Sequence, residues 1–185
     1  MIPYVQEKSI VMKTFITTLL LLLCLNSMAQ NQLPDFSFEQ VKMSNITMPY
    51  RKATIAPMHG EKPAVVIYLH GGSSKGSDNT TQMNEPGIEL IANYLQSSHI
   101  NALFLVPQCP KDKSWMGPMY PVLKSMIERY TTDNDAQPAT ADINKVYIFG
   151  GSMGGTGTWG MLSMYPDMFA AAMPVAGNPS QCVAE

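Results

Sequence analysis

Histidine, cysteine and tryptophan are scarce in this sequence of 185 residues, which contains 3, 3 and 2 of them respectively. No cysteine has a histidine or a second cysteine at the spacing of a zinc site, so we expect no bound metal, and no motif implies a cofactor. Charged residues make up only 14 % of the chain, the net charge is −2, and lysine and arginine do not cluster. These features exclude a nucleic-acid-binding surface.

Long apolar runs are missing as well, apart from one near the N-terminus. Residues 15–25 form an apolar run of about 11 residues, which is too short to span a bilayer. Lys13 precedes this run, and Ser27-Met28-Ala29 follows it with the small residues of a signal-peptidase site. We interpret residues 1–29 as a signal peptide cleaved after Ala29. The mature protein is then expected to be secreted or periplasmic, with no membrane span.

Two cysteines, Cys109 and Cys182, would remain after this cleavage. An oxidising compartment permits a disulfide bond between them, but spacing alone does not show that they are close. A disulfide and two unpaired thiols both remain open at this point.

The order of the apolar patterns predicts an α/β protein. Predicted strands alternate with amphipathic segments, and this alternation favours a mostly parallel central sheet with helices on both faces. Residues 30–47 read as a linker and an edge strand, and residues 48–185 as the domain itself. The predicted strands span residues 36–43, 48–56, 64–69, 102–106, 145–149 and 169–175, and the predicted helices 87–96, 119–130 and 156–165.

One stretch carries a recognisable chemical motif. Gly150-Gly151-Ser152-Met153-Gly154 follows a predicted strand and fits G-x-S-x-G, the nucleophile elbow of α/β-hydrolases. The elbow is a sharp strand-to-helix turn, and Gly150 and Gly154 leave the space that such a turn needs. Ser152 is therefore the candidate nucleophile. The alternative is a Gly/Ser turn with only a structural role.

A serine nucleophile also needs donors for the oxyanion. The backbone N–H of Met153, directly after the nucleophile, is the first expected donor. The second is expected from the glycine-rich loop after strand 64–69, with Gly72 preferred and Ser73 next. His70 opens this loop at the end of a buried strand, and we interpret it as a support for the loop rather than as the general base.

Several further motifs occur in one order and resemble a known family. These motifs are His70-Gly71-Gly72, Gly76-Ser77-Asp78-Asn79, Val106-Pro107-Gln108-Cys109-Pro110, Asp142-Ile143-Asn144-Lys145, Gly151-Ser152-Met153-Gly154-Gly155 and Tyr165-Pro166-Asp167. With them the chain resembles secreted α/β-hydrolases of the polyhydroxybutyrate-depolymerase/feruloyl-esterase-like group, also described as predicted peptidases with a prolyl-oligopeptidase-like domain.

The resemblance implies a serine hydrolase that acts through an acyl-enzyme on Ser152. Its expected substrate is a small-molecule or polysaccharide-linked ester, which would make the protein a carboxylesterase. A serine peptidase of the prolyl-oligopeptidase type is the alternative within the same chemistry. Ser73, Trp115 and Trp159 are candidates for lining the substrate pocket, although ordinary packing explains the two tryptophans equally well.

The chain departs from the family in one respect. In this fold the catalytic acid and histidine follow the serine in the sequence, but His59, His70 and His99 all precede Ser152. We therefore expect an α/β-hydrolase domain that is incomplete at its C-terminus and turns over substrate very slowly. A domain that has lost catalysis and acts as a binding or scaffold module is the alternative from a different class.

Overall fold

The computed structural model describes residues 33–133 and 137–179. The predicted signal peptide and its cleavage site lie outside these residues, as does Cys182. The described residues from Pro34 onward belong to one compact unit. Within the described residues, no helix has the length and apolar character needed to cross a membrane.

A sheet of six strands forms the centre of this unit, in the order β1-β2-β4-β3-β5-β6. The first two strands pair antiparallel with each other, β2 pairs antiparallel with β4, and the remaining pairs are parallel. The mostly parallel sheet predicted from the sequence is therefore confirmed, with β1 at one edge. The strands are β1 (Ser37–Met43), β2 (Ile46–Ile55), β3 (Ala64–Leu69), β4 (Ala102–Pro107), β5 (Val146–Gly151) and β6 (Ala171–Val175).

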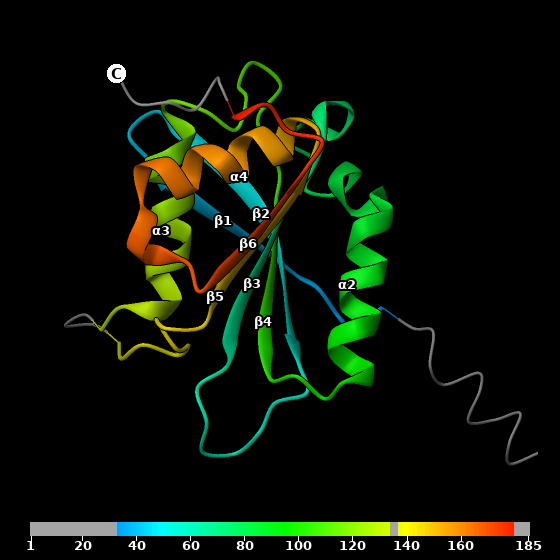
Figure 1. Cartoon of the computed structure of the whole chain (residues 1–185), viewed down its shortest axis with the longest axis vertical. Coiled ribbons are helices and arrows are strands. Elements are labelled where there is room, and N and C mark those ends of the chain that lie inside the picture. Colours follow the sequence, from blue (N-terminus) through cyan, green and yellow to red (C-terminus); the bar gives the residue numbers. More distant parts are fainter. Residues whose placement is uncertain (1–32, 134–136, 180–185) are drawn as a thin grey trace, which may run out of the picture. The chain divides into compact units, whose positions relative to one another are not determined.

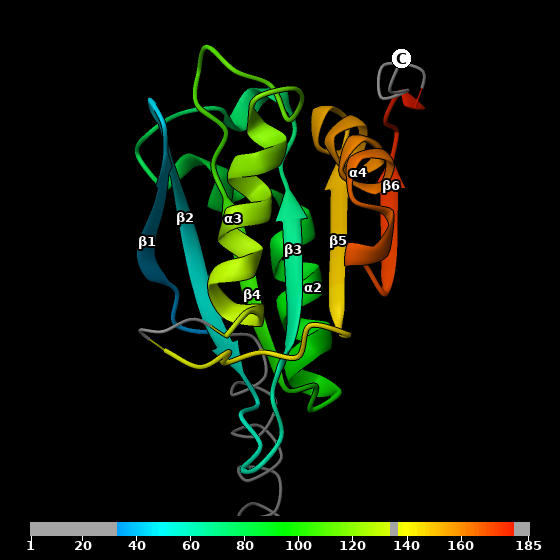
Figure 2. The ribbon, with the colours of Figure 1, turned by 90° about the vertical axis from the view of Figure 1, so that its left-hand side faces the viewer.

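Helices cover both faces of the sheet. Figure 2 shows α3 (Met119–Thr131) and α4 (Met153–Met164) on one face and α2 (Pro86–Ser97) behind the other. These positions follow from right-handed crossovers, because the chain moves in opposite directions across the sheet in its β3–β4 and β5–β6 connections. The carboxyl ends of the parallel strands therefore share one edge of the sheet (Figure 1).

Two apolar cores result, one on each face. Alternate residues of β3 point to opposite sides, so that Val65 and Ile67 pack in the core under α3 while Val66 packs under α2. All six residues of β4 are buried. The unbroken apolar runs in the sequence thus mark strands that are covered on both faces.

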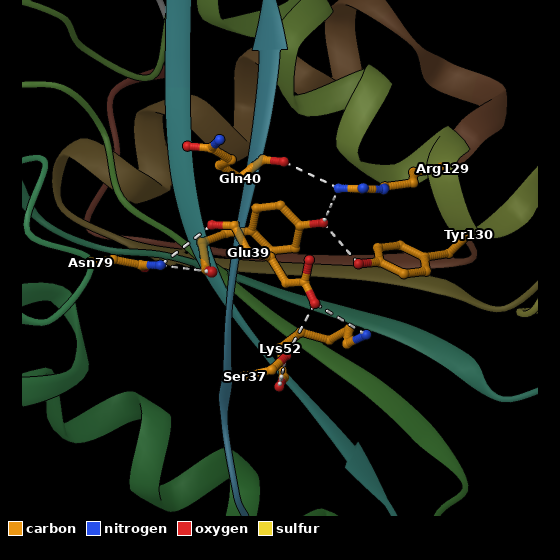
Figure 3. Close-up of polar contacts among 8 residues, drawn as sticks. Ser37, Glu39, Gln40, Lys52, Asn79, Arg129 and Tyr130 are labelled. Atoms are coloured by element: carbon orange, nitrogen blue, oxygen red, sulfur yellow. Dashed lines mark hydrogen bonds and ion pairs between the residues drawn. The ribbon is translucent and has the colours of Figure 1, made fainter.

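A polar cluster joins the antiparallel edge of the sheet to α3 (Figure 3). The hydroxyls of Tyr50 and Tyr130 lie 2.7 Å apart. Arg129 Nη1 donates to the Tyr50 hydroxyl and to the carbonyl of Gln40, at 3.1 Å in both cases. Burial raises the pKa of Tyr130, and the hydrogen bond with Tyr50 raises it further. The cluster fixes β1 and β2 against α3.

The boundaries of α4 differ from the prediction. The expected helix began at residue 156, but α4 begins at Met153 directly after the candidate nucleophile. Three of its first five residues are glycine, which has low helix propensity. Because of these glycines, the helix was predicted to begin later than it does. Close packing of the backbone against neighbouring strands overrides that propensity, as the glycine contacts below show.

Candidate active site

The turn between β5 and α4 has the geometry of a nucleophile elbow. Ser152 has φ 54° and ψ −117°, a combination that side chains with a Cβ rarely adopt. Its backbone is held on both sides, because its N–H donates to Val175 O at 2.9 Å and its carbonyl accepts from Thr156 N at 3.0 Å. The surrounding structure thus imposes a strained conformation on this residue. Its side chain is exposed at the carboxyl edge of the sheet.

The two motif glycines are required by close contacts at this turn. A Cβ on Gly154 would lie 1.8 Å from the carbonyl oxygen of Leu69, and one on Gly150 would lie 2.3 Å from Gly154 O. Neither contact can be relieved by moving a side chain, since backbone atoms form both. Gly150 and Gly154 therefore bring β5, α4 and the end of β3 together, and this places Ser152 beside the loop that follows β3.

That loop begins at His70 and contains η1 (Gly72–Ser74) and η2 (Thr81–Asn84). A Cβ built on Gly71 would lie 3.8 Å from Ser152 Cβ, so the loop adjoins the serine. A Cβ on Gly72 would meet no atom within 4 Å, which shows open space at the residue preferred as oxyanion donor. The N–H of Met153 opens α4, where first-turn N–H groups lack an intrahelical acceptor.

His70 is fully buried, and both of its ring nitrogens are used. The backbone N–H of Cys109 donates to Nε2 at 2.9 Å, so Nε2 carries no proton. Nδ1 must then carry the proton, and it donates to Gly71 O at 2.6 Å. Burial lowers the pKa of His70, in agreement with a neutral ring. His70 therefore supports the loop and is not placed to accept a proton from Ser152.

A second network holds the far part of the loop. The backbone N–H of Asn79 donates to the Gln108 side chain at 2.7 Å, and Gln108 Nε2 donates to Asp78 at 2.8 Å. Hydrogen bonds hold the pKa of Asp78 well below its ordinary value, first from the Thr81 hydroxyl and then from the N–H groups of Thr81 and Thr80. Asn79 also donates to Tyr50 O at 3.0 Å, which ties the loop to β2 (Figure 3).

Comparison with known proteins identifies the fold that carries this arrangement. No family model matches the chain. A curated relative, poly(3-hydroxyalkanoate) depolymerase C of Paucimonas lemoignei, is 35 % identical over 60 residues, or 32 % of this chain and 13 % of the relative. The crystal structure of a thermostable esterase matches with 28 % identity and a TM-score of 0.58, covering 78 % of this chain and 41 % of that one. The chain has the α/β-hydrolase fold.

A further solved α/β-hydrolase extends this comparison. The feruloyl esterase module from Clostridium thermocellum, solved in complex with sinapinate, superposes with a TM-score of 0.61 at 17 % identity. That match covers 79 % of this chain and 55 % of the module. The chain therefore spans about half the length of these two solved structures. The resemblance drawn from the motifs is confirmed for this group of α/β-hydrolases.

Not every residue proposed from the α/β-hydrolase resemblance lies where a substrate could reach it. Trp115 does not line an accessible pocket, because its side chain is fully buried. Its indole N–H donates to His70 O at 2.9 Å, and its ring meets the His70 ring edge-on with centroids 5.0 Å apart. Gly157 of α4 packs directly against it. Trp159 and Ser73 are exposed and remain candidates.

Glu85 is a site residue that sequence reasoning missed. Its Oε1 accepts from the N–H of Gly71 at 3.3 Å and from the Ser74 hydroxyl at 2.6 Å. In the sequence, Glu85 stands before Pro86 and looks like an ordinary residue at the start of a helix. Glu85 follows Gly71 by 14 residues in the sequence, and only the folded chain brings its carboxylate to the Gly71 N–H.

The remaining titratable candidates lie elsewhere. His59 is in the connection between β2 and β3, and His99 precedes β4, so both are at the amino ends of parallel strands, opposite the elbow. Asp167 lies in η3 (Pro166–Met168), beyond the far end of the 12-residue helix α4. Within residues 33–133 and 137–179, no histidine other than His70 is at the edge of the sheet that carries Ser152.

The described residues also form a cavity of about 670 Å³ that is separate from the elbow. It lies between α2 and the sheet, and its mainly apolar walls include Ile91, Tyr94, Tyr147 and Phe149. Residues at the amino ends of the strands, such as Lys62 and Lys145, border it. It therefore has no part in chemistry at Ser152.

Proposed function

We propose that the protein is a serine hydrolase of the esterase type, with Ser152 as its nucleophile. The observation that carries this proposal is the strained, exposed serine that the fold holds between a helix N-terminus and a glycine-rich loop. The pair φ 54° and ψ −117° imposes a strain on Ser152 that glycine would avoid, and the exposed hydroxyl is the group that a serine adds at this turn.

The reaction has two acyl-transfer steps. Ser152 Oγ attacks the acyl carbon of the ester, its proton passes to a general base, and the carbonyl oxygen becomes an oxyanion. Collapse of this intermediate breaks the bond to the leaving alcohol, which takes up the proton from the base. Water, deprotonated by the same base, then attacks the acyl-enzyme and releases the acid and the free serine.

The oxyanion donors proposed here are the N–H groups of Met153 and Gly72. Met153 is the first residue of α4, so its N–H also benefits from the positive end of the helix dipole. One such donor is typically worth about 3 kcal/mol of barrier lowering. The open space next to Gly72 is consistent with a substrate oxygen between the two donors.

The general base is not among the described residues. His70 keeps both ring nitrogens in hydrogen bonds within a buried site. We propose that the acid and the base belong to the part of the fold that the solved structures have and this chain does not span. By itself, the 185-residue chain is then expected to acylate slowly and to turn over very little.

The proposed substrates are esters, either small molecules or esters linked to polysaccharide. This proposal is supported by the names of the similar proteins, which are an esterase, a feruloyl esterase module and a depolymerase of polyhydroxyalkanoate. The predicted signal peptide favours a secreted or periplasmic location, where polymeric substrates are accessible. Because an amide leaving group uses the same machinery, paired ester and amide substrates with one acyl group separate esterase from peptidase activity.

Labelling with a fluorophosphonate probe tests the nucleophile directly. Because the base is missing from the described residues, the probe is applied with and without imidazole as an external base. We expect imidazole to accelerate labelling of the wild-type chain, with the probe attached at Ser152 by mass spectrometry. Ser152→Ala should abolish this labelling, whereas Ser163→Ala, an exposed serine on the same helix, should leave it unchanged.

Equal labelling of wild type and Ser152→Ala would show that the nucleophile is wrongly assigned. If wild type remains unlabelled even with imidazole, the second candidate, a non-catalytic binding or scaffold domain, gains support. That candidate is favoured by one observation only, the lack of a usable base among the described residues.

A further inference from the structure

Glu85 contacts both ends of the turn that carries Gly72. The same carboxylate oxygen accepts from Gly71 N–H, just before η1, and from the hydroxyl of Ser74, its last residue. Both bonds bridge separate segments, since Glu85 belongs to the start of α2. No other described side chain bonds to both ends of this turn.

The backbone of Glu85 is itself firmly placed. Its N–H donates to Gln82 O at 3.3 Å in η2, and its carbonyl accepts from Ile88 N at 3.1 Å in the first turn of α2. Pro86 follows it with a fixed φ, which suits the first position of a helix. The carboxylate therefore extends from a rigid helix start rather than from a mobile loop.

Hydrogen bonds to the Gly71 carbonyl orient the peptide between Gly71 and Gly72. Gly71 O accepts from His70 Nδ1 at 2.6 Å and from Ser74 N at 3.3 Å. In a planar trans peptide the next N–H points opposite to that carbonyl, so the Gly72 N–H points away from His70. Glu85 accepts from the preceding N–H, that of Gly71, and from the Ser74 hydroxyl at the other end of the turn. Rotation of the turn would therefore break the hydrogen bonds of Glu85 at both ends.

We propose that Glu85 is a positioning residue that holds the loop in the conformation presenting the Gly72 N–H to the oxyanion. This inference rests on the proposed function of Ser152 and adds a residue that the G-x-S-x-G motif does not contain. Glu85 acts through Gly71 and Ser74 and does not touch the reacting atoms. Its role depends on an acceptor oxygen and not on its negative charge.

Amide hydrogen exchange tests this role without any need for turnover. In Glu85→Ala the Gly71 N–H loses its acceptor, and we expect it to exchange about tenfold faster, as for the loss of one hydrogen bond. Glu85→Gln keeps an acceptor oxygen and should restore slow exchange. Glu89→Ala, an exposed glutamate one turn further along α2, is the matched control and should change nothing.

The second measurement is the rate of imidazole-assisted fluorophosphonate labelling at Ser152. We expect Glu85→Ala to slow it at least about tenfold through misplacement of one oxyanion donor, and Glu85→Gln to keep the wild-type rate. Circular dichroism of each variant identifies any that fail to fold. If Glu85→Ala does not fold, two other variants decide the outcome. Glu85→Gln is then compared with wild type, and Ser74→Ala removes the other contact of Glu85.

The two proposals fail in different ways. Unchanged Gly71 exchange in Glu85→Ala overturns the positioning role, whatever the labelling shows. Faster exchange with unchanged labelling shows that Glu85 orders the loop but does not position an oxyanion donor, which also overturns it. Absent labelling of the wild-type chain overturns the proposed function, and the exchange data then still report whether Glu85 holds the loop.

Discussion

Protonation of His70 should destabilise the folded protein, and the size of the effect follows from its surroundings. The ring is fully buried, and its unprotonated Nε2 accepts from the Cys109 N–H at 2.9 Å. A proton on Nε2 would place two donors against each other and a charge in an apolar site beside Trp115. Burial accordingly lowers the pKa of His70 in the folded state.

The sign of the pH dependence is determined by this shift. Because the folded pKa lies below the unfolded value of about 6.5, the unfolded chain takes up the proton first as the pH falls. The stabilising contribution of His70 is therefore complete above the unfolded pKa and is lost toward acid pH. The loss reaches at most about 1.4 kcal/mol per pH unit, which amounts to up to about 2 kcal/mol between pH 7.5 and pH 5.

Urea unfolding of wild type and His70→Gln across this pH range measures the effect. Glutamine keeps an acceptor for the Cys109 N–H but does not titrate, so the difference in unfolding free energy between the two proteins isolates His70. The ionisable groups that the two proteins share contribute alike to both measurements and cancel in the difference.

One result would refute this reasoning. If the difference between wild type and His70→Gln stays constant from about pH 7.5 to about pH 5, the folded protein accepts the proton as readily as the unfolded chain. His70 would then be free enough to act as a base, and its assignment as a loop support would be wrong.

Two further predictions concern the elbow. Gly154→Ala should lower the unfolding free energy by about 3 kcal/mol, because its Cβ would lie 1.8 Å from a backbone oxygen, whereas Gly72→Ala, with nothing within 4 Å, should change it by less than about 0.5 kcal/mol. Urea unfolding compares them, and equal losses would contradict the contact argument. Ser152→Gly should raise the unfolding free energy by about 1 kcal/mol through relief of strain at φ 54°, while Ser152→Ala, which keeps its Cβ, should not. A loss of stability in Ser152→Gly would show that the turn is unstrained.

The sequence predicted the elements and the elbow because their signals are local. Buried parallel strands appear in the sequence as unbroken apolar runs, and α3 appears as an amphipathic repeat. The predicted bounds of these elements therefore agree with the observed ones to within a residue or two. G-x-S-x-G works for the same reason, since both glycines and the serine contribute to one turn. The start of α4 was misjudged because glycine propensity is local evidence, whereas the contact of Gly154 with Leu69 is not.

The sequence by itself predicted an α/β chain with a serine elbow and a glycine-rich loop after strand 64–69, and it showed that no histidine follows Ser152 in the 185 residues. Only the tertiary structure decided which other side chains surround Ser152 and the loop after β3. It places the Glu85 carboxylate against Gly71, engages both nitrogens of His70, and buries Trp115 where a substrate cannot reach. Each of these outcomes depends on groups that are distant in sequence and meet only when the sheet is assembled. Composition, periodicity and spacing carry no information about such long-range contacts.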